Sequence, residues 1–423
     1  MLLDCQYEHY SFLYVNNKEM RFTYRIIVNL KDTVDFSAMK KAVDTAIKRY
    51  PYFSVKVVKH GNEYDVVPNE KPIPVINSSD SVCFGTDETN GHLIAVCCEN
   101  NTVNFDFYHG LTDASGATPF IQSVLYYYIT ERCGKAIDCE GIRLADDELL
   151  PDETCSPLSN TTEFPDEPLY EYTPQPAFNF AKYDGDLDNK ETVYYIDVDE
   201  KSLMELSKSN DGTPNSIVAA MLYKTILRLY PDVEEPIVAG VAINSRPALK
   251  MQNNYADLIS LMKLNYPIKA KDYDLNRLGT LGRGMIILQS QPENMLFEIK
   301  NRMKFAEYLK TLPSDKARQQ AYKGVVDNNR KFSSFGISYV GRQRWYSLEP
   351  YIDSVYTATM PSKDSLCVEI NVINGTFGVC FSQTFSSDKY VKAFMQILSE
   401  QNIPHTFKGK SDMNIASAKI LDE

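Results

Sequence analysis

The stretch that decides the fold is FDFYHGLTDASG, residues 105–116. It continues an alternating apolar run from Val103, and this alternation predicts a strand that ends at His109. The next residues predict a helix over 114–129, which places Asp113 where a helix N-cap is expected. A histidine at a strand end can reach a cavity. The pattern is short, however, and a hydrogen-bonded histidine beside a helix-capping aspartate is the other interpretation.

The residues upstream of this stretch predict a mixture of helices and strands. A strand is expected over 25–30, and a helix with one apolar side is expected over 36–50, with Asp35 at its N-cap. Alternating runs on either side of short polar turns predict two hairpins, 53–58 with 63–67 and 93–98 with 103–108. The first part of the chain is therefore expected to form one α/β unit.

An acidic, proline-rich segment separates this unit from the rest of the chain. Between residues 146 and 171 there are nine acids and no Lys or Arg, and this composition favours an extended connection. We therefore expect four parts, an N-terminal half over 1–145, a crossover over 146–180, a C-terminal half over 181–405 and a loosely held tail over 406–423.

The C-terminal half repeats a similar order of strands and helices. A helix capped by Thr213 is expected over 214–230, and a buried strand over 236–243 ends in NSRP, residues 244–247. The other expected elements are strands over 192–198, 335–340, 367–373 and 376–381, two helices within 292–330 and a helix over 388–398. Two similar halves predict a pseudo-duplicated fold of the α/β (α+β) class.

The composition argues against several classes of protein. The chain has 423 residues and a formal net charge of −12, which is unfavourable for a general nucleic-acid binder because phosphates attract Lys and Arg. We expect no signal peptide and no membrane span, because no basic leader or long apolar stretch is present. Nine scattered cysteines favour a reduced, cytoplasmic chain. The five histidines form no metal-binding pattern, so no metal is expected.

Four segments together resemble the coenzyme-A-dependent acyltransferase superfamily, which includes chloramphenicol acetyltransferase, alcohol acetyltransferases, plant BAHD enzymes and the condensation domains of peptide synthetases. Residues 108–116 resemble its His-x-x-x-Asp-Gly signature, and RYPYF, residues 49–53, resembles the segment after its first helix. NSRP is similar to its VDxRp segment, and FGISYVG, residues 335–341, is similar to its SNxG strand. These segments occur in the family's order over about residues 20–400, so the set is more specific than any one motif.

The resemblance implies two chloramphenicol-acetyltransferase-like halves, each a mixed sheet flanked by helices, with an active-site tunnel between them. It implies that His109 is the general base, which takes a proton from a hydroxyl or amine acceptor that attacks the thioester of acyl-coenzyme A. Asp113 would support the catalytic loop by pairing with Arg246. Ser338 would contact the oxyanion, with an ordinary strand serine as the alternative. No residue is assigned to coenzyme A.

Three departures from the family patterns narrow the comparison. Ala114 stands where many members have Gly, Tyr108 replaces the first of the two histidines usual in condensation domains, and the BAHD Asp-Phe-Gly-Trp-Gly motif is absent. These departures favour a stand-alone microbial O-acetyltransferase of the alcohol acetyltransferase type. A condensation enzyme that uses a carrier protein, and a non-catalytic protein that binds an apolar ligand, are the alternatives.

One basic segment suits an anionic acyl donor. Residues 300–344 contain eleven Lys and Arg against three acids, which gives a local net charge of +8 in an acidic chain. Such a segment could receive the phosphates of coenzyme A or the acidic surface of a carrier protein. Solvated polar helix faces are the other interpretation.

Overall fold

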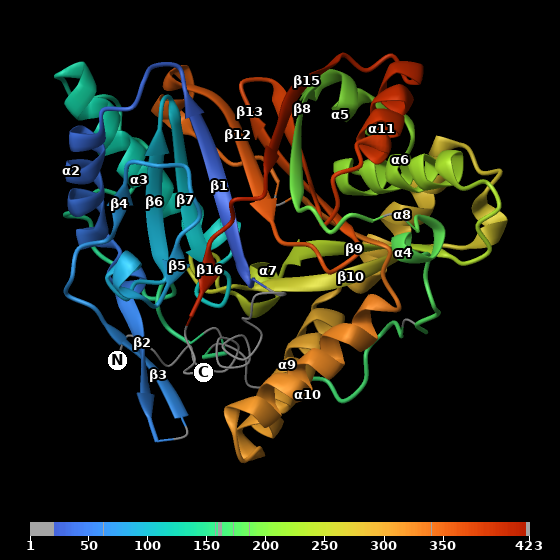
Figure 1. The fold of residues 1–423 in the computed structure, drawn as a ribbon, viewed down its shortest axis with the longest axis horizontal. Helices are drawn as coiled ribbons and strands as arrows, with labels where there is room; N and C mark the ends of the chain where they lie inside the picture. The colour runs from blue at the N-terminus through green and yellow to red at the C-terminus, as the bar shows by residue number, and fades with distance from the viewer. Residues whose placement is uncertain are drawn as a thin grey trace.

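The computed structural model describes residues 21–61, 63–156, 158–159, 163–171, 173–185, 187–339 and 341–419. These residues form two main sheets, each covered by helices on its outer side, and the sheets face each other across the middle of the molecule (Figure 1). Residues 1–20 of the expected N-terminal half and residues 420–423 of the expected tail lie outside the described residues. No helix in the described part of the chain is long and apolar enough to cross a bilayer.

The first sheet is the centre of the N-terminal half. Tyr24, Ile26 and Val28 on its strand β1 point into a core shared with helices α2 and α3, whereas Ile27 faces the second sheet. The sheet has the strand order β12-β1-β7-β6-β4. Its elements are β1 (Thr23–Leu30), β4 (Val75–Ile76), β6 (Ile94–Glu99), β7 (Thr102–Tyr108), β12 (Ile352–Thr359), α2 (Phe36–Ala46) and α3 (Ala114–Cys133).

The second sheet has seven strands in the order β10-β9-β11-β13-β14-β8-β15. Strand β11 is parallel to both neighbours, and the other pairs are antiparallel. The apolar side of this sheet packs on helices α6 and α11. The elements are β8 (Thr192–Asp199), β9 (Ile237–Asn244), β10 (Ile259–Tyr266), β11 (Phe335–Tyr339), β13 (Leu366–Ile373), β14 (Thr376–Gln383), β15 (His405–Asp412), α4 (Phe180–Tyr183), α5 (Glu200–Ser209), α6 (Pro214–Leu229), α7 (Arg246–Leu249), α8 (Leu275–Gln289) and α11 (Lys389–Glu400).

Strand β12 departs from the expected division at residues 181–405. It comes from the C-terminal half of the chain but joins the N-terminal sheet, where it pairs with β1 from Tyr24↔Thr359 to Leu30↔Ile352. The alternation of a strand shows which side chains are buried but not which sheet the strand joins, because any free edge can accept its backbone hydrogen bonds. The two sheets are therefore connected through this strand as well as through the crossover.

The expectation of a loosely held tail from residue 406 is wrong for the described residues. Strand β15 pairs with the edge strand β8, and a short strand β16 (Ser417–Ala418) pairs with β5 (Cys83–Phe84) of the N-terminal half. Residues 413–419, here called the C-terminal strap, therefore cross from one half to the other (Figure 1). The physical reason is burial, because Met413, Ile415 and Ala416 are each less than 5% exposed.

The described residues of the acidic crossover form turns and no helix or strand up to α4. One of its acids, Glu153, is buried and lies 2.9 Å from a guanidinium nitrogen of Arg49 and 2.7 Å from one of Arg143. Two arginines of the N-terminal half therefore anchor the crossover, which explains how a carboxylate can lie in the interior.

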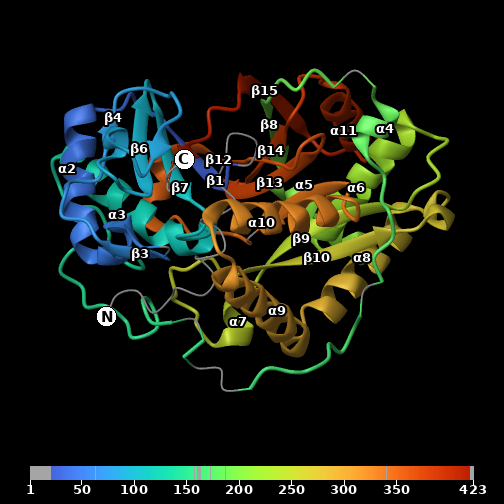
Figure 2. The ribbon, with the colours of Figure 1, turned by 60° about the horizontal axis from the view of Figure 1, so that its bottom comes forward.

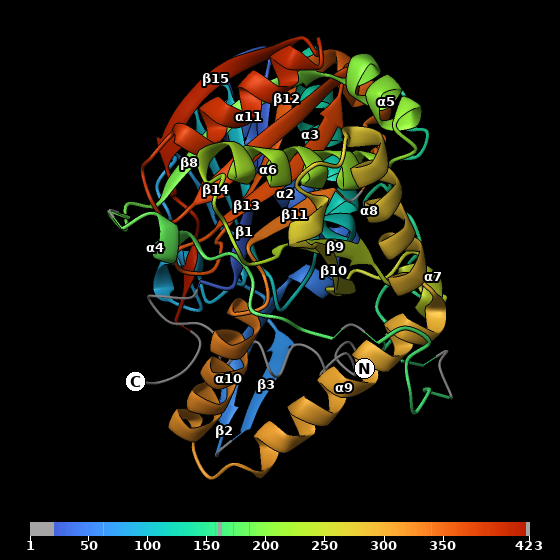
Figure 3. The ribbon, with the colours of Figure 1, turned by 90° about the vertical axis from the view of Figure 1, so that its right-hand side faces the viewer.

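A helical hairpin lies below the second sheet and reaches back to the N-terminal half. It consists of α9 (Pro292–Thr311) and α10 (Asp315–Arg330), and Figures 2 and 3 show it beside the hairpin of β2 (Val55–His60) and β3 (Glu63–Pro68). The contact is polar, because the Tyr64 hydroxyl donates to Asp315 at 2.7 Å and the Lys59 ammonium lies 3.3 Å from the same carboxylate. Leu309 adds an apolar contact with the N-terminal core.

Candidate active site

His109 lies directly after β7, at the end of the N-terminal sheet. Its backbone N–H donates to the carbonyl of Phe22 at 2.9 Å, which continues the pairing of β7 with β1 by one residue. The imidazole packs between the rings of Phe22 and Tyr24, with centroid distances of 5.1 and 5.0 Å. Two aromatic rings therefore fix the imidazole where the two halves meet.

The acidic partner of His109 is Asp257, which comes from the C-terminal half. Nδ1 of His109 lies 3.1 Å from Oδ2 of Asp257, and the two side chains are 26% and 5% exposed. Burial alone would lower the pKa of His109, but the charge of Asp257 outweighs burial and raises this pKa to about 9. With Nδ1 turned towards the carboxylate, Nε2 is the ring nitrogen left for a substrate.

Asp113 is not the acidic partner of His109 but forms a buried ion pair with Arg246. The guanidinium of Arg246 donates to both carboxylate oxygens of Asp113, at 2.8 and 2.9 Å, and both side chains are at most 3% exposed. Asp113 also caps α3 by accepting from the N–H of Gly116 at 2.8 Å. Breaking one partner of such a buried pair typically costs about 3–5 kcal/mol.

The same network holds the loop that carries Asp257. Arg246 donates to the carbonyls of Asn254 at 2.9 Å and Ala256 at 2.7 Å, and Asp113 accepts from the N–H of Leu258 at 2.8 Å. These bonds lie on both sides of Asp257 in the chain. Asp113 and Arg246 therefore fix the backbone of residues 254–258, and this backbone sets the distance between Asp257 and His109.

In the signature that residues 108–116 resemble, a glycine directly follows the aspartate, whereas here the glycine is Gly116. The packing around residue 116 explains why this position needs a glycine. A Cβ atom at residue 116 would lie 2.3 Å from the carbonyl oxygen of Tyr255 and 2.6 Å from Oγ1 of Thr112. The helix start and the loop 254–258 approach each other too closely for a side chain. The half-buried Ala114, where many family members have Gly, carries no such constraint.

Ser338 lies on β11, on the side of the second sheet that faces the N-terminal half. Its register partner on the neighbouring strand β13 is Glu369, so the two side chains lie next to each other on the same face of the sheet. Glu369 also accepts from Thr359 on β12 at 3.0 Å. Thr359 pairs with Tyr24, whose ring contacts His109. Ser338 therefore belongs to a polar cluster next to the histidine.

About half of the cations in the basic segment 300–344 are paired with acids within the protein. Six of its eleven cations form ion pairs with acids, and Arg302 donates to the carbonyl of Ile259 at 2.8 Å. Three of these acids, Glu307, Asp315 and Asp327, belong to the segment itself and are already counted in its net charge of +8, so the segment stays basic. Among the described residues no group of His, Cys, Asp and Glu has an arrangement that could hold a metal ion.

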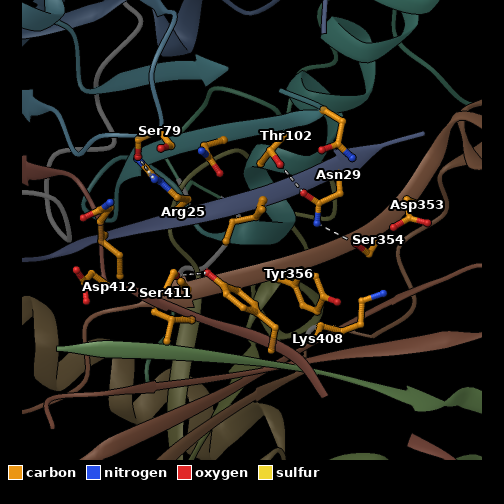
Figure 4. Close-up of a pocket in the computed structure, with 18 residues that line it drawn as sticks. Arg25, Asn29, Ser79, Thr102, Asp353, Ser354, Tyr356, Lys408, Ser411 and Asp412 are labelled. Atoms are coloured by element: carbon orange, nitrogen blue, oxygen red, sulfur yellow. Dashed lines mark hydrogen bonds between the residues drawn. The ribbon is translucent and has the colours of Figure 1, made fainter. Parts of the chain in front are cut away.

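A separate polar cavity of about 420 Å³ lies between the two sheets (Figure 4). Arg25 and Asn29 of β1 and Tyr356 of β12 line one side, and Lys408 and Ser411 of β15 line the other. None of the four residues expected from the sequence lines this cavity. We therefore place the candidate active site at His109 rather than in the cavity.

Comparison with solved structures identifies the fold. F. sporotrichioides TRI101, complexed with coenzyme A and T-2, is 11% identical, covers 94% of this chain and 98% of its own, and has a TM-score of 0.59. Polyketide synthase associated protein 5 from Mycobacterium tuberculosis is also 11% identical, with coverages of 92% and 95% and a TM-score of 0.58. The starter condensation domain of rhizomide synthetase RzmA, in complex with C8-CoA, has 11% identity, coverages of 95% and 94% and a TM-score of 0.58.

These likenesses span nearly the whole chain and confirm the expected fold, which this chain shares with TRI101, polyketide synthase associated protein 5 and the RzmA condensation domain. No family model matches the sequence, and no curated protein matches it. At this level of identity the comparisons establish the fold alone, so the role of each residue is argued from its geometry.

Two residues of the site are absent from the sequence expectations. Asp257 follows Tyr255 and Ala256 in a loop without any motif, and nothing local marks it as a partner of His109. Glu369 did leave a signal, because it is an acid in the middle of the apolar strand β13. An acid at such a position is either paired or functional, since burial of an unpaired carboxylate is unfavourable.

Proposed function

We propose that this protein is an acyltransferase that moves an acyl group from acyl-coenzyme A to a hydroxyl or amine, with His109 as the general base. The observation that carries this proposal is the position of His109 where the two halves meet, with Nδ1 at 3.1 Å from Asp257. A histidine oriented by a carboxylate through one ring nitrogen can accept a proton at the other.

The proposed reaction has two steps. Nε2 of His109 removes the proton of the acceptor as its oxygen or nitrogen attacks the thioester carbonyl carbon. The tetrahedral intermediate then expels the coenzyme A sulfur, which takes the proton back from His109 and leaves as a thiol. Ser338 is proposed to donate a hydrogen bond to the oxyanion between these steps.

The nature of the donor rests on the similar structures. F. sporotrichioides TRI101 is complexed with coenzyme A and T-2, and the RzmA domain with C8-CoA. Both proteins share the fold of this chain over more than nine tenths of its length. We therefore propose acyl-coenzyme A as co-substrate and a small hydroxyl compound as the first acceptor to test, which makes the protein an O-acetyltransferase candidate.

The experiment measures thiol release from acetyl-coenzyme A with a panel of alcohols and amines. We expect His109→Ala to lower the rate by about 10²–10⁴-fold, the usual contribution of a general base, without a large change in melting temperature. His60→Ala is the matched control, because His60 is an exposed residue at the end of β2, next to the turn of the hairpin β2–β3. Equal release by wild type and His109→Ala would refute the role of His109.

An acyl group on a carrier protein is the second candidate donor. The RzmA domain belongs to a synthetase although its ligand is C8-CoA, so the shared fold does not separate the two donors. The same assay with an acylated carrier protein in place of acetyl-coenzyme A distinguishes them, because only the true donor is expected to give His109-dependent turnover.

A further inference from the structure

Glu369 is a buried carboxyl group on the inner side of the second sheet. It is 7% exposed and lies in the middle of β13, where its neighbours in the chain, Val368 and Ile370, point into the core on the other side. Its register partners are Ser338 on β11 and Cys380 on β14. Because Cys380 packs against the N-terminal half, Glu369 faces the region where the two halves meet.

The groups in direct contact with the Glu369 carboxyl are neutral hydrogen-bonding groups. Thr359 donates to Oε1 at 3.0 Å, the thiol of Cys367 lies 3.4 Å from the same oxygen, and Ser338 is the register partner of Glu369 on β11, on the same face of the sheet. In the described part of the chain no Lys or Arg forms an ion pair with Glu369. Burial therefore raises the pKa of Glu369 above its ordinary value, which favours the protonated carboxylic acid.

Glu369 is also close enough to His109 for the two groups to interact electrostatically. The connection through the backbone is short, because Thr359 donates to Glu369 and pairs with Tyr24, and the ring of Tyr24 lies 5.0 Å from the ring of His109. The base from one half and the Ser338–Glu369 pair from the other are therefore parts of one site.

The protonation state of Glu369 decides what Ser338 can do. A serine hydroxyl has one hydrogen, and a carboxylate can only accept. Beside an ionised Glu369, the Ser338 hydrogen is used for the carboxylate and cannot reach a substrate. Beside a protonated Glu369, the acid can donate to Oγ of Ser338, and the serine hydrogen is free for another acceptor.

We propose that Glu369 is a positioning residue, held as a neutral carboxylic acid, that donates to Ser338 and so directs the Ser338 hydroxyl to the thioester carbonyl oxygen of the acyl donor. This inference rests on the proposed acyl transfer. No covalent bond of the protein changes, because the proton stays between Glu369 and Ser338 while the oxyanion accepts from Ser338.

The titratable groups that face Glu369 are Cys367 on its own strand, Cys380 on β14 and His109 from the N-terminal half. Burial raises the pKa of both thiols, so that they stay neutral over the working range. Only His109 and Glu369 then change charge together, and their titrations are coupled. The reaction needs a neutral His109 and a protonated Glu369, which predicts a bell-shaped dependence of kcat/KM on pH.

The test compares kcat/KM against pH for wild type, Glu369→Gln, Glu369→Ala and Ser338→Ala. The amide of Glu369→Gln can donate to Ser338, so we expect kcat/KM of this variant at its pH optimum to stay within about tenfold of wild type. Because the amide does not titrate, we also expect the decrease of kcat/KM at alkaline pH to disappear. Glu369→Ala and Ser338→Ala are each expected to lose about 10²–10³-fold in kcat, as for an oxyanion donor. A Glu369→Gln variant as inactive as Glu369→Ala, or one that keeps the alkaline fall, overturns the inference.

A second measurement needs no turnover. Infrared difference spectra between wild type and Glu369→Gln without substrate are expected to show the carbonyl band of one protonated carboxylic acid at neutral pH. An ionised Glu369 in an active enzyme overturns this inference alone. Absence of His109-dependent thiol release in the wild type overturns the proposed function, and with it the role of Ser338, whatever the spectrum shows.

Discussion

His109 owes its charge state to Asp257, a residue that no sequence motif marks. The carboxylate at 3.1 Å makes the imidazole a stronger base and raises its pKa to about 9 despite burial. The same charge favours the protonated imidazole, which cannot accept a proton, so the neutral form of His109 is the minor one at pH 7 in the free enzyme. The proposed reaction therefore combines a strong base with a small active fraction, and the balance between them depends on Asp257.

Removal of this charge is expected to lower the pKa of His109. For Asp257→Asn we expect a decrease of about 1 to 3 pH units, because an opposite charge at this distance has an effect of that size. The measurement is an NMR titration of protein labelled in its five histidines, with His109→Ala to assign the signal. An unchanged midpoint in Asp257→Asn would show that the carboxylate does not control His109.

Stability should depend on pH through the same pair. The folded-state pKa of about 9 lies above the ordinary value of 6.5, so the ion pair stabilises the fold fully below pH 6.5 and progressively less as the pH rises to about 9. We expect the melting temperature of the wild type to fall more steeply over this range than that of Asp257→Asn. Parallel curves would contradict this expectation.

At the scale of elements, the start of α3 and the loop 254–258 behave as one unit. Asp113 caps the helix and binds Arg246 and the N–H of Leu258, so that one carboxylate connects a helix with the loop that positions Asp257. The close approach of Gly116 to the Tyr255 carbonyl makes this junction sensitive to a single methyl group.

Gly116→Ala is expected to destabilise the protein by about 1–3 kcal/mol, as overpacking of a buried site does, and to lower turnover by moving the loop of Asp257. Chemical denaturation and the thiol-release assay measure the two effects. Gly324→Ala in α10 is the control, because a Cβ atom there meets nothing within 4 Å and alanine favours a helix by about 1 kcal/mol or less. Equal stability of the two variants would contradict the proposed close contact.

At the scale of the whole molecule, the described part of the chain joins its two halves through the crossover, through β12 and through the C-terminal strap. Met413, Ile415 and Ala416 of the strap are buried where the two sheets meet. The strap also binds the N-terminal half through its backbone, because the N–H of Ser417 donates to the Val82 carbonyl at 2.8 Å. Because the proposed site takes residues from both halves, these connections hold its parts at fixed distances.

Ile415→Ala is expected to destabilise the protein by about 2–5 kcal/mol, the usual loss for a buried isoleucine, and to lower turnover without any contact with substrate. Asn414→Ala is the control, because Asn414 is exposed between two buried residues of the strap. Thermal unfolding of both variants measures the difference, and similar melting temperatures would show that the strap contributes little.

Much of the fold was open to prediction from the sequence because helices and strands follow local periodicity. The helix after Asp113, the hairpin of β6 and β7 and the buried strand β9 all lie close to their expected ranges. The places of β12 and β15 in their sheets could not be predicted, because the alternation of a strand does not indicate which strand it will pair with. Burial of the strap was hidden for the same reason, since its few apolar residues gain their partners only from two separate sheets.

The sequence by itself determined the candidate base, its place at a strand end and, through the family resemblance, the pair of Asp113 and Arg246 that is present in the structure. Only the tertiary structure decided that Asp257 faces His109 and that Glu369 lies beside Ser338 in the second sheet. The physical reason is that both contacts join residues far apart in the chain. Burial and charge act between such residues only after the two sheets have come together.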